Sequence, residues 1–160
     1  MVLLEFNSQY DQDSIRQLSI PVKMIGKKLQ LSMFEELLFE PVESVSQDLD
    51  GHWLFATRGP DTGQERRTDA NSRKTLKILK DGRFQWIAYD TDSFTFSGTG
   101  GGPYTATNGI YSEQIDFFSK DSTRVGALLE FKYALQDKDW HHTGTNSKGE
   151  PLYDIWGKRE

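Results

Sequence analysis

The chain has 160 residues, no cysteine and a net charge of -5 at pH 7. A chain of about 150 residues buries roughly 70% of its unfolded surface, so a single core forms without cross-links, and the lack of cysteine excludes disulfides and thiol chemistry. Because 24 acidic residues outnumber 19 basic ones, and no apolar stretch reaches helix-spanning length, we expect neither a nucleic-acid partner nor insertion into a membrane. Residues 1–20 also lack the pattern of a signal peptide.

The first 48 residues predict an extension of extra strands with one short helix. Ser32-Met33-Phe34-Glu35 has the pattern of a capping box, and Pro41 ends the apolar run that follows it. This pattern predicts a helix of one or two turns. We expect its apolar side to cover one end of the core.

The same extension repeats short pieces of the last fifty residues. The similar pieces are 4–8 with 115–119, 13–16 with 121–124, and 40–42 with 150–152, all offset by about 110 residues. They predict that residues 1–48 are the terminal strands of a preceding repeat, with chance similarity of common dipeptides as the alternative. Strands without their own barrel expose their edges, so we expect them to pack on the second unit, to pair in a homodimer, or to belong to a longer protein.

Residues 49–160 break into short alternating runs separated by turn residues. Asp81-Gly82 and Asn108-Gly109 are hairpin signals, so the flanking runs are expected to be antiparallel neighbours. The candidate strands cover 52–58, 73–79, 83–89, 93–97, 102–107, 110–118, 123–135, 137–143 and 152–158. Almost no helical periodicity accompanies them. The series predicts an all-β domain, an eight-stranded antiparallel up-and-down barrel, with a sandwich as the alternative.

The run FSGTGGGPY, at residues 96–104, has the composition of either a phosphate loop or a strand bend. A dinucleotide fingerprint requires a glycine where Pro103 stands and a helix after it, whereas residues 104–107 continue as a strand. The glycines are therefore expected to form a bend between two barrel strands. Close approach of a ligand beside Tyr104 is the alternative.

Few ionisable residues have a pattern that indicates chemistry. His141 and His142 are adjacent in a candidate strand, so they point to opposite faces and do not share a metal ion; an inward His142 would be a polar group at the base of a pocket. Glu113 shares a face with apolar neighbours, where burial would suit it to acid or base work. No nucleophile motif is present, and we predict no metal or cofactor.

A 14-residue loop, residues 59–72, is longer than an ordinary hairpin loop. Its Arg66 and Arg67 could bind an anionic group at the mouth of the barrel through charge-assisted hydrogen bonds. The alternative is a solvated loop with local ion pairs.

Two ends of the barrel domain carry a family resemblance. Gly51-His52-Trp53 is a Gly-x-Trp at the first barrel strand, and Lys158-Arg159 follow Trp156 in the last one. This pairing resembles the lipocalin and wider calycin signature, which implies that Trp53 closes the barrel beneath Arg159. The pieces GPDTGQERR, LKDGRFQWIAYDT and GTGGGPY resemble a group of lipocalin-like bacterial proteins of unknown function, some with two units in tandem. The resemblance implies a secreted, periplasmic or cell-envelope barrel and no established activity.

The leading functional prediction is a barrel that binds a small apolar or aromatic molecule without catalysis. Eight strands leave room for interior side chains or one small ligand. The residues expected inside are Phe55, Trp86, Phe117, Phe131 and Tyr133, with Tyr104, His142, Arg66 and Arg67 at polar points. One alternative is a filled barrel that serves as a structural or interaction module of the cell envelope. The other is a calycin-type enzyme that uses Glu113 or His142.

Overall fold

The computed structural model describes residues 2–3, 5–6, 17–146 and 148–159, and within them the fold is all-β. The elements are β1 (Val2–Leu3), β2 (Gln17–Leu18), β3 (Val22–Ile25), β4 (Lys28–Leu31), the 3-10 helix η1 (Ser32–Phe34), β5 (Leu38–Phe39), β6 (Gly51–Arg58), β7 (Arg73–Lys80), β8 (Arg83–Asp90), β9 (Thr95–Thr107), β10 (Ile110–Gln114), β11 (Phe117–Phe118), the 3-10 helix η2 (Ser122–Arg124), β12 (Leu128–Gln136), β13 (Asp139–Thr145) and β14 (Pro151–Arg159). A search of the described helices finds none with the length and apolar character to cross a bilayer.

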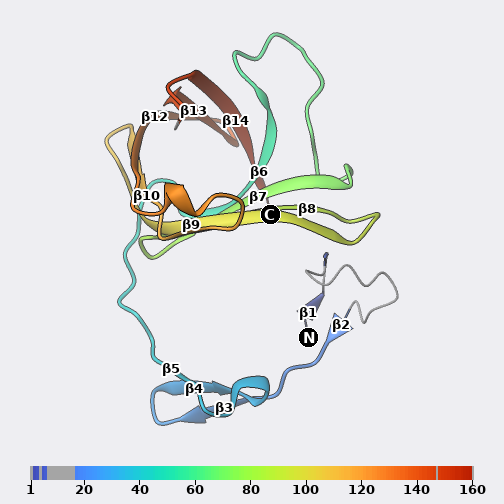
Figure 1. Cartoon of the computed structure of the whole chain (residues 1–160), viewed down its shortest axis with the longest axis vertical. Coiled ribbons are helices and arrows are strands. Elements are labelled where there is room, and N and C mark those ends of the chain that lie inside the picture. The colour runs from blue at the N-terminus through green and yellow to red at the C-terminus, as the bar shows by residue number, and fades with distance from the viewer. Residues whose placement is uncertain (1, 4, 7–16, 147, 160) are drawn as a thin grey trace.

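Eight of these strands close into an antiparallel barrel, which confirms the predicted fold class (Figure 1). Each of β6, β7, β8, β9, β10, β12, β13 and β14 pairs with the next, and β14 returns to β6. The closing register runs from Asp154 opposite Arg58 to Arg159 opposite His52. β11 is an additional strand on β9. The edges that an open sheet would expose are therefore paired.

Hairpin turns at the predicted positions set the order of these strands. Asp81 and Asn108 have positive φ of 49° and 52°, and the glycine after each is also in the left-handed region. Asx-Gly pairs adopt this conformation readily, and its twist matches that of the flanking strands. The two turns join β7 to β8 and β9 to β10 as neighbours.

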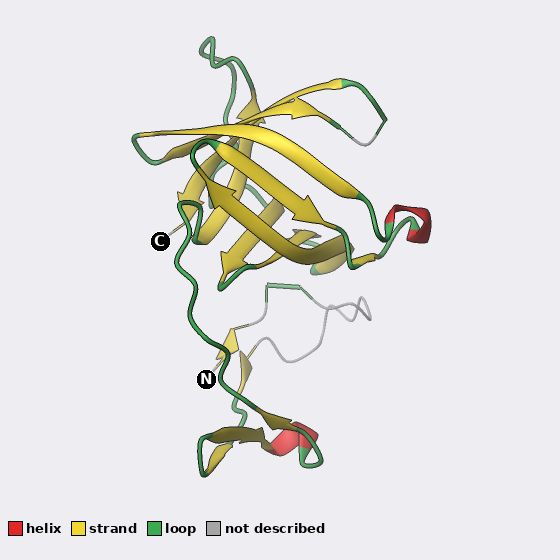
Figure 2. Ribbon diagram, turned by 90° about the vertical axis from the view of Figure 1, so that its left-hand side faces the viewer, coloured by secondary structure: helices red, strands yellow, loops and turns green. Residues whose placement is uncertain are grey.

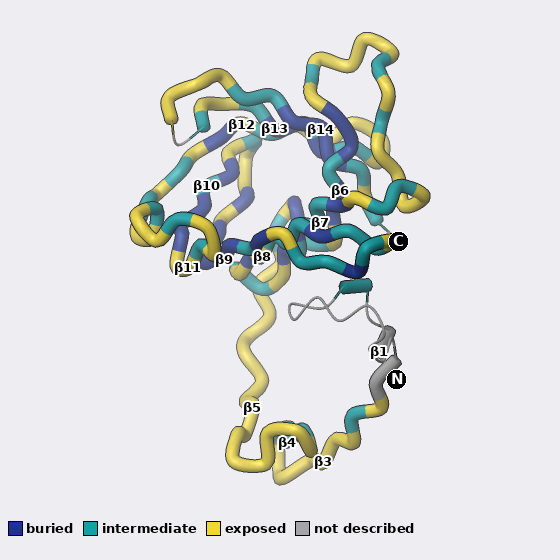
Figure 3. The backbone as a smooth tube through the Cα atoms, turned by 45° about the vertical axis from the view of Figure 1, so that its right-hand side comes forward, coloured by how far each residue is buried: buried dark blue, intermediate teal, exposed yellow. Residues whose placement is uncertain are grey.

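The core fills the end of the barrel that contains the start of β6. Trp53 is buried, its indole Nε1 donates to the Leu49 carbonyl oxygen at 2.8 Å, and its ring meets Trp140 edge-on at 5.7 Å. The Lys158 ammonium lies 5.0 Å from the Trp53 ring centroid. This end of the barrel is closed by side chains, and Figure 3 shows the buried positions concentrated on the barrel strands.

The glycine-rich run differs from the predicted bend, because residues 95–97 of one candidate strand and all of the candidate strand 102–107 belong to one continuous strand, β9. A Cβ at Gly101 would lie 2.5 Å from the Phe84 carbonyl oxygen, and one at Gly102 would overlap the carbonyl oxygen of Gln114. The backbone after β10 thus crosses close over β9. The glycines make room for another backbone, as glycines inside strands often do.

Two further strand boundaries differ from the prediction. The candidate strand 110–118 is interrupted at Ile115 and Asp116, where the chain passes from β10 to β11. The candidate strand 123–135 begins only at Leu128, because the Asp121 side chain accepts a hydrogen bond from the Thr123 backbone and starts η2 instead. Local side-chain bonds of this kind compete with strand pairing.

The extension forms two small sheets beside the barrel, β1–β2 and β3–β4–β5 (Figures 1 and 2). The short helix exists as η1, but its N-cap is Leu31 without a side-chain bond. Met33 and Phe34 are 53% and 45% exposed, so the expected cover over the core is not formed. The pieces 4–8 and 13–16 of the predicted repeat lie mostly outside the described residues, and the duplication remains a prediction.

Hydrogen bonds near both ends of the extension join it to the barrel. Glu5 accepts hydrogen bonds from Arg159 at 2.7 and 3.0 Å, and this partner, with Tyr89, lowers the pKa of Glu5 to about 2 despite partial burial. Gln47 accepts from the Ala106 backbone at 2.6 Å. Hydrogen bonds to the barrel therefore begin before residue 49, the predicted start of the domain.

Candidate functional site

Two adjoining hollows occupy the end of the barrel opposite Trp53. The inner cavity has a volume of about 240 Å³ and the mouth pocket about 650 Å³. The inner cavity is lined by Thr75, Lys77, Trp86, Glu113, Ile115, Phe118, Arg124, Ala127, Leu129, Phe131, His142, Asn146, Leu152, Asp154 and Trp156. The mouth pocket is lined by Phe55, Ala56, Thr57, Arg58, Gln64, Glu65, Arg67, Asn71, Thr75, Asp154 and Trp156. Both share Thr75, Asp154 and Trp156, so the two hollows lie against each other at these residues.

Aromatic rings form the walls of both hollows. Trp86 packs against Phe118 in the inner cavity, with ring centroids 5.3 Å apart. Phe55 meets Trp156 edge-on at 5.6 Å where the cavity joins the mouth pocket. Phe131 is buried and also lines the inner cavity. These surfaces suit the apolar or aromatic part of a ligand.

A buried ion pair lies against the inner cavity. Lys77 Nζ is 2.7 Å from Glu113 Oε2, and the Tyr111 hydroxyl donates to the same carboxylate oxygen at 2.5 Å. The lysine ammonium also lies 4.6 Å from the Tyr111 ring centroid and 5.0 Å from that of Phe84. The two charges compensate each other, because burial of either one alone would carry a large desolvation cost.

Two buried polar side chains on the cavity wall have unpartnered atoms. Within the described part of the chain, both ring nitrogens of His142 and the indole Nε1 of Trp156 have no hydrogen-bond partner. His142 is 4% exposed and Trp156 is 7% exposed. Burial, and secondarily the charge of Lys77, holds the pKa of His142 well below its ordinary value. The ring is therefore neutral at pH 7 and presents one donor and one acceptor.

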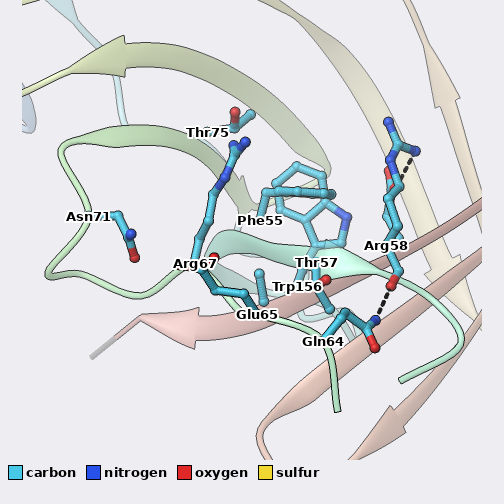
Figure 4. A pocket seen from close by; sticks show the side chains of 11 residues that line it. Phe55, Thr57, Arg58, Gln64, Glu65, Arg67, Asn71, Thr75 and Trp156 are labelled. Atoms are coloured by element: carbon cyan, nitrogen blue, oxygen red, sulfur yellow. Dashed lines mark hydrogen bonds and ion pairs between the residues drawn. The ribbon is translucent and has the colours of Figure 1, made fainter. Parts of the chain in front are cut away.

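Charged side chains surround the mouth pocket (Figure 4). The Arg58 guanidinium donates to Asp154 at 2.5 Å, and burial raises the pKa of that carboxyl. Arg67 lies on the other side, 5.4 Å from the Phe55 ring centroid, and its backbone N–H donates to the Ala56 carbonyl. The figure shows Phe55 and Trp156 between the two guanidinium groups.

Five of the predicted ligand-binding residues line these hollows: Phe55, Arg67, Trp86, Phe131 and His142. Arg66 instead holds the long loop to the barrel, because its guanidinium bonds Asp61 at 2.9 Å and Asp139 at 2.7 Å. The loop itself therefore supplies one predicted arginine to the mouth pocket and uses the other for structure.

Two predicted tyrosines lie near the linker after the extension. Tyr104 is buried and donates to Asp50, and burial followed by this bond raises its pKa. Tyr133 donates to Asp48 at 2.5 Å, and burial with that carboxylate raises its pKa to about 12. Neither belongs to the lining of the inner cavity or the mouth pocket. Both hold the chain as it enters the barrel.

Phe117 was predicted inside the barrel, and the structure places it on the outer surface, 43% exposed. The interruption at Ile115 and Asp116 shifts the alternation by one position. Ile115 is buried, and Phe118 turns toward Trp86. Simple alternation across 110–118 cannot show this shift.

Of the two residues predicted to close the barrel, Trp53 and Arg159, only Trp53 lies in the closed end. The cation over its ring is Lys158. Arg159 points away to Glu5 and Tyr89, with the Arg159 Nη1 to Tyr89 Oη distance at 3.3 Å. Successive strand residues face opposite sides, so only one of the two basic residues can lie over the tryptophan.

Sequence reasoning missed Lys77, Phe118 and Asp154. Alternation in β7 places Lys77 on the same face as Thr75 and Leu79, so this signal was available. Its pairing with Glu113, 36 positions away, depends on strand order around the barrel and has no local signal.

Metal binding finds no support in this arrangement: no group of three or more His, Asp or Glu residues is placed to hold an ion within the described ranges. No protein-family model matches the chain, and no curated protein matches it. What the site can bind is therefore inferred from its own side chains and not from a relative.

Proposed function

We propose that the protein is a lipocalin-like barrel that binds a small molecule with an apolar or aromatic body, without catalysis. The observation that carries this proposal is the aromatic-walled inner cavity, which adjoins the mouth pocket at Thr75, Asp154 and Trp156. Small-molecule sites have volumes of about 300–1,000 Å³, with apolar walls and a few polar groups. The inner cavity alone is smaller than this range, so the ligand would extend into the mouth.

The family resemblance supports a location outside the cytoplasm, in the periplasm, the cell envelope or the medium. A barrel there would meet its ligand in solution and hold it by burial of apolar surface, worth roughly 25 cal/mol per Å². Glu113 and His142 would contribute to binding and not to catalysis, because the Glu113 carboxylate already bonds Lys77 and Tyr111, and His142 has no hydrogen-bond partner among the described residues to exchange a proton with.

A thermal-shift screen against fatty acids, aromatic metabolites and sugars tests the proposal, with tryptophan fluorescence as a second readout. Two neighbouring residues of β12 supply matched variants: Leu129 lines the inner cavity and Leu128 is 73% exposed. Leu129→Phe should remove the shift by filling the cavity, and Leu128→Phe should keep it. No shift with any class, or shifts that survive Leu129→Phe, would contradict the proposal.

A second candidate function is an interaction module that forms a homodimer through the extension. Large apolar side chains of β3 and β5 are exposed, among them Val22 at 61%, Met24 at 60% and Phe39 at 42%. Exposed apolar patches of this kind mark interaction surfaces. Light scattering after size exclusion tests this candidate, and a clean monomer at high concentration would remove it.

A further inference from the structure

We infer that the inner cavity receives a neutral hydrogen-bonding end of the ligand, a carboxamide or a related carbonyl group, against Trp156 and His142. The inference rests on the proposed function, because it names the chemistry that the cavity selects. It goes further in predicting which end of an amphipathic molecule enters the barrel.

The first step is the set of unpartnered atoms. Buried polar groups in proteins nearly always have a hydrogen-bond partner, and each exception has a cost that something else must offset. Trp156 Nε1 and both nitrogens of His142 are such exceptions, and both side chains line the inner cavity. Trp140 Nε1 is also unpartnered but Trp140 is not part of the lining, so Trp156 and His142 are the two residues that combine unpartnered atoms with a place in the cavity wall.

The second step is the kind of bond that these atoms can make. An indole N–H only donates, and a neutral imidazole donates from one nitrogen and accepts at the other. Burial keeps the imidazole neutral. A carbonyl oxygen satisfies the donors, and an amide N–H satisfies the acceptor. A carboxamide carries both groups within one planar unit.

The third step is charge. The Lys77 ammonium is already bonded to Glu113 at 2.7 Å, and Asp154 adds a second carboxyl to the lining. Arg124 is the other cation of the lining and is paired with Asp121 at 3.4 Å, while Asp154 is paired with Arg58 at 2.5 Å. A carboxylate or an ammonium in the cavity would therefore lose its hydration without a free counter-charge. A neutral group avoids this cost. A charged end of the same ligand would stay in the mouth pocket beside Arg67.

Three probes of the same shape separate these cases: 2-naphthamide, 2-naphthoate and 2-methylnaphthalene. Their dissociation constants are measured by tryptophan fluorescence titration. The amide should bind at least about tenfold more tightly than the other two, since one net hydrogen bond is worth about that factor. Trp156→Phe keeps an aromatic ring and removes the N–H, so it should abolish the advantage of the amide over 2-methylnaphthalene.

Leu128→Phe is the control, because Leu128 precedes the cavity residue Leu129 on β12 but is 73% exposed and lines neither hollow. It should leave the preference for the amide unchanged. If Trp156→Phe does not fold, the indole N–H resonance of Trp156 in the wild-type protein provides the readout. It should lie further downfield with 2-naphthamide than with 2-methylnaphthalene, whose ring is the same but which accepts no hydrogen bond.

Equal affinity for the amide and 2-methylnaphthalene, a preference for the carboxylate, or a preference that survives Trp156→Phe would overturn the inference. Failure of all three probes to bind would overturn it as well. The screen with fatty acids, aromatic metabolites and sugars decides the proposed function separately, because it succeeds with any ligand that Leu129→Phe displaces.

Discussion

Lys77 and Glu113 are the two residues whose exchange should affect stability most sharply. Their side chains are 6% and 9% exposed, and each compensates the charge of the other. Glu113→Gln leaves the lysine ammonium buried without a counter-charge, which costs about 3–5 kcal/mol in comparable pairs. Lys77→Met added to Glu113→Gln should recover most of this loss, because glutamine still accepts from the Tyr111 hydroxyl. Urea denaturation measures both effects.

The control for this pair is the surface ion pair between Arg83 and Asp116, 2.8 Å apart and 68% and 45% exposed. Asp116→Asn should cost under about 1 kcal/mol, because water solvates the arginine that remains. A loss from Glu113→Gln no larger than that from Asp116→Asn would show that the interior pair is solvated. A double variant as unstable as Glu113→Gln alone would show that the unpaired lysine charge does not cause the loss.

Strand β9 gives the corresponding test for an element. Gly102→Ala would force its methyl group into the backbone of Gln114, and overpacking of this kind costs about 1–3 kcal/mol or more. Gly98→Ala is the control, because its methyl group meets the flexible end of the Lys120 side chain, which can move. Thermal unfolding of the two variants should differ by several degrees. Equal melting temperatures would mean that the backbone at Gln114 is not held against β9.

The elements also show what the sequence could and could not predict. Asp-Gly and Asn-Gly pairs determine hairpins through local backbone conformation, so both turns were predictable. The single strand through the glycines was not predictable from the sequence. The glycines are required by another part of the backbone that lies close to them in space. Alternation predicted inward Phe55, Phe131 and His142, and it failed at Phe117, where the strand is interrupted. Neighbours across the barrel leave no local pattern.

Across the whole molecule, the closed end of the barrel contributes mainly to stability, and the open end holds the proposed binding site. The closed end packs Trp53 against Trp140 and covers it with Lys158. Trp140 is one of three buried side chains with unpartnered atoms among the described residues, and the other two, Trp156 and His142, line the cavity at the open end. A ligand that bonds these atoms would stabilise the folded state by mass action. Binding and thermal stability are therefore expected to rise together.

The burial of His142 at the open end should make the free energy of unfolding depend on pH. Burial lowers the pKa of His142 below its ordinary value of 6.5, so the unfolded chain takes up a proton near pH 6.5 and the folded protein does not. The unfolded state is favoured as the pH falls, and the free energy of unfolding should drop by up to about 2 kcal/mol between pH 7 and pH 5. Lys77, Glu113, Tyr111 and Asp154 surround the ring or lie beside it, and Asp154 stands opposite it in the β13–β14 register.

His142→Gln keeps a neutral polar group and should flatten the dependence over this range, whatever its effect on stability at pH 7. His141→Gln is the control, since His141 lies on the other face and contacts the Tyr153 hydroxyl at 3.0 Å. It should retain the wild-type slope. Urea denaturation at pH 7, 6 and 5 gives the slope of the free energy of unfolding against pH for the wild type and for each variant. Parallel slopes for wild type and His142→Gln would mean that the ring takes up a proton while folded, and the cavity would then hold a cation instead of the neutral donor and acceptor that favour an amide.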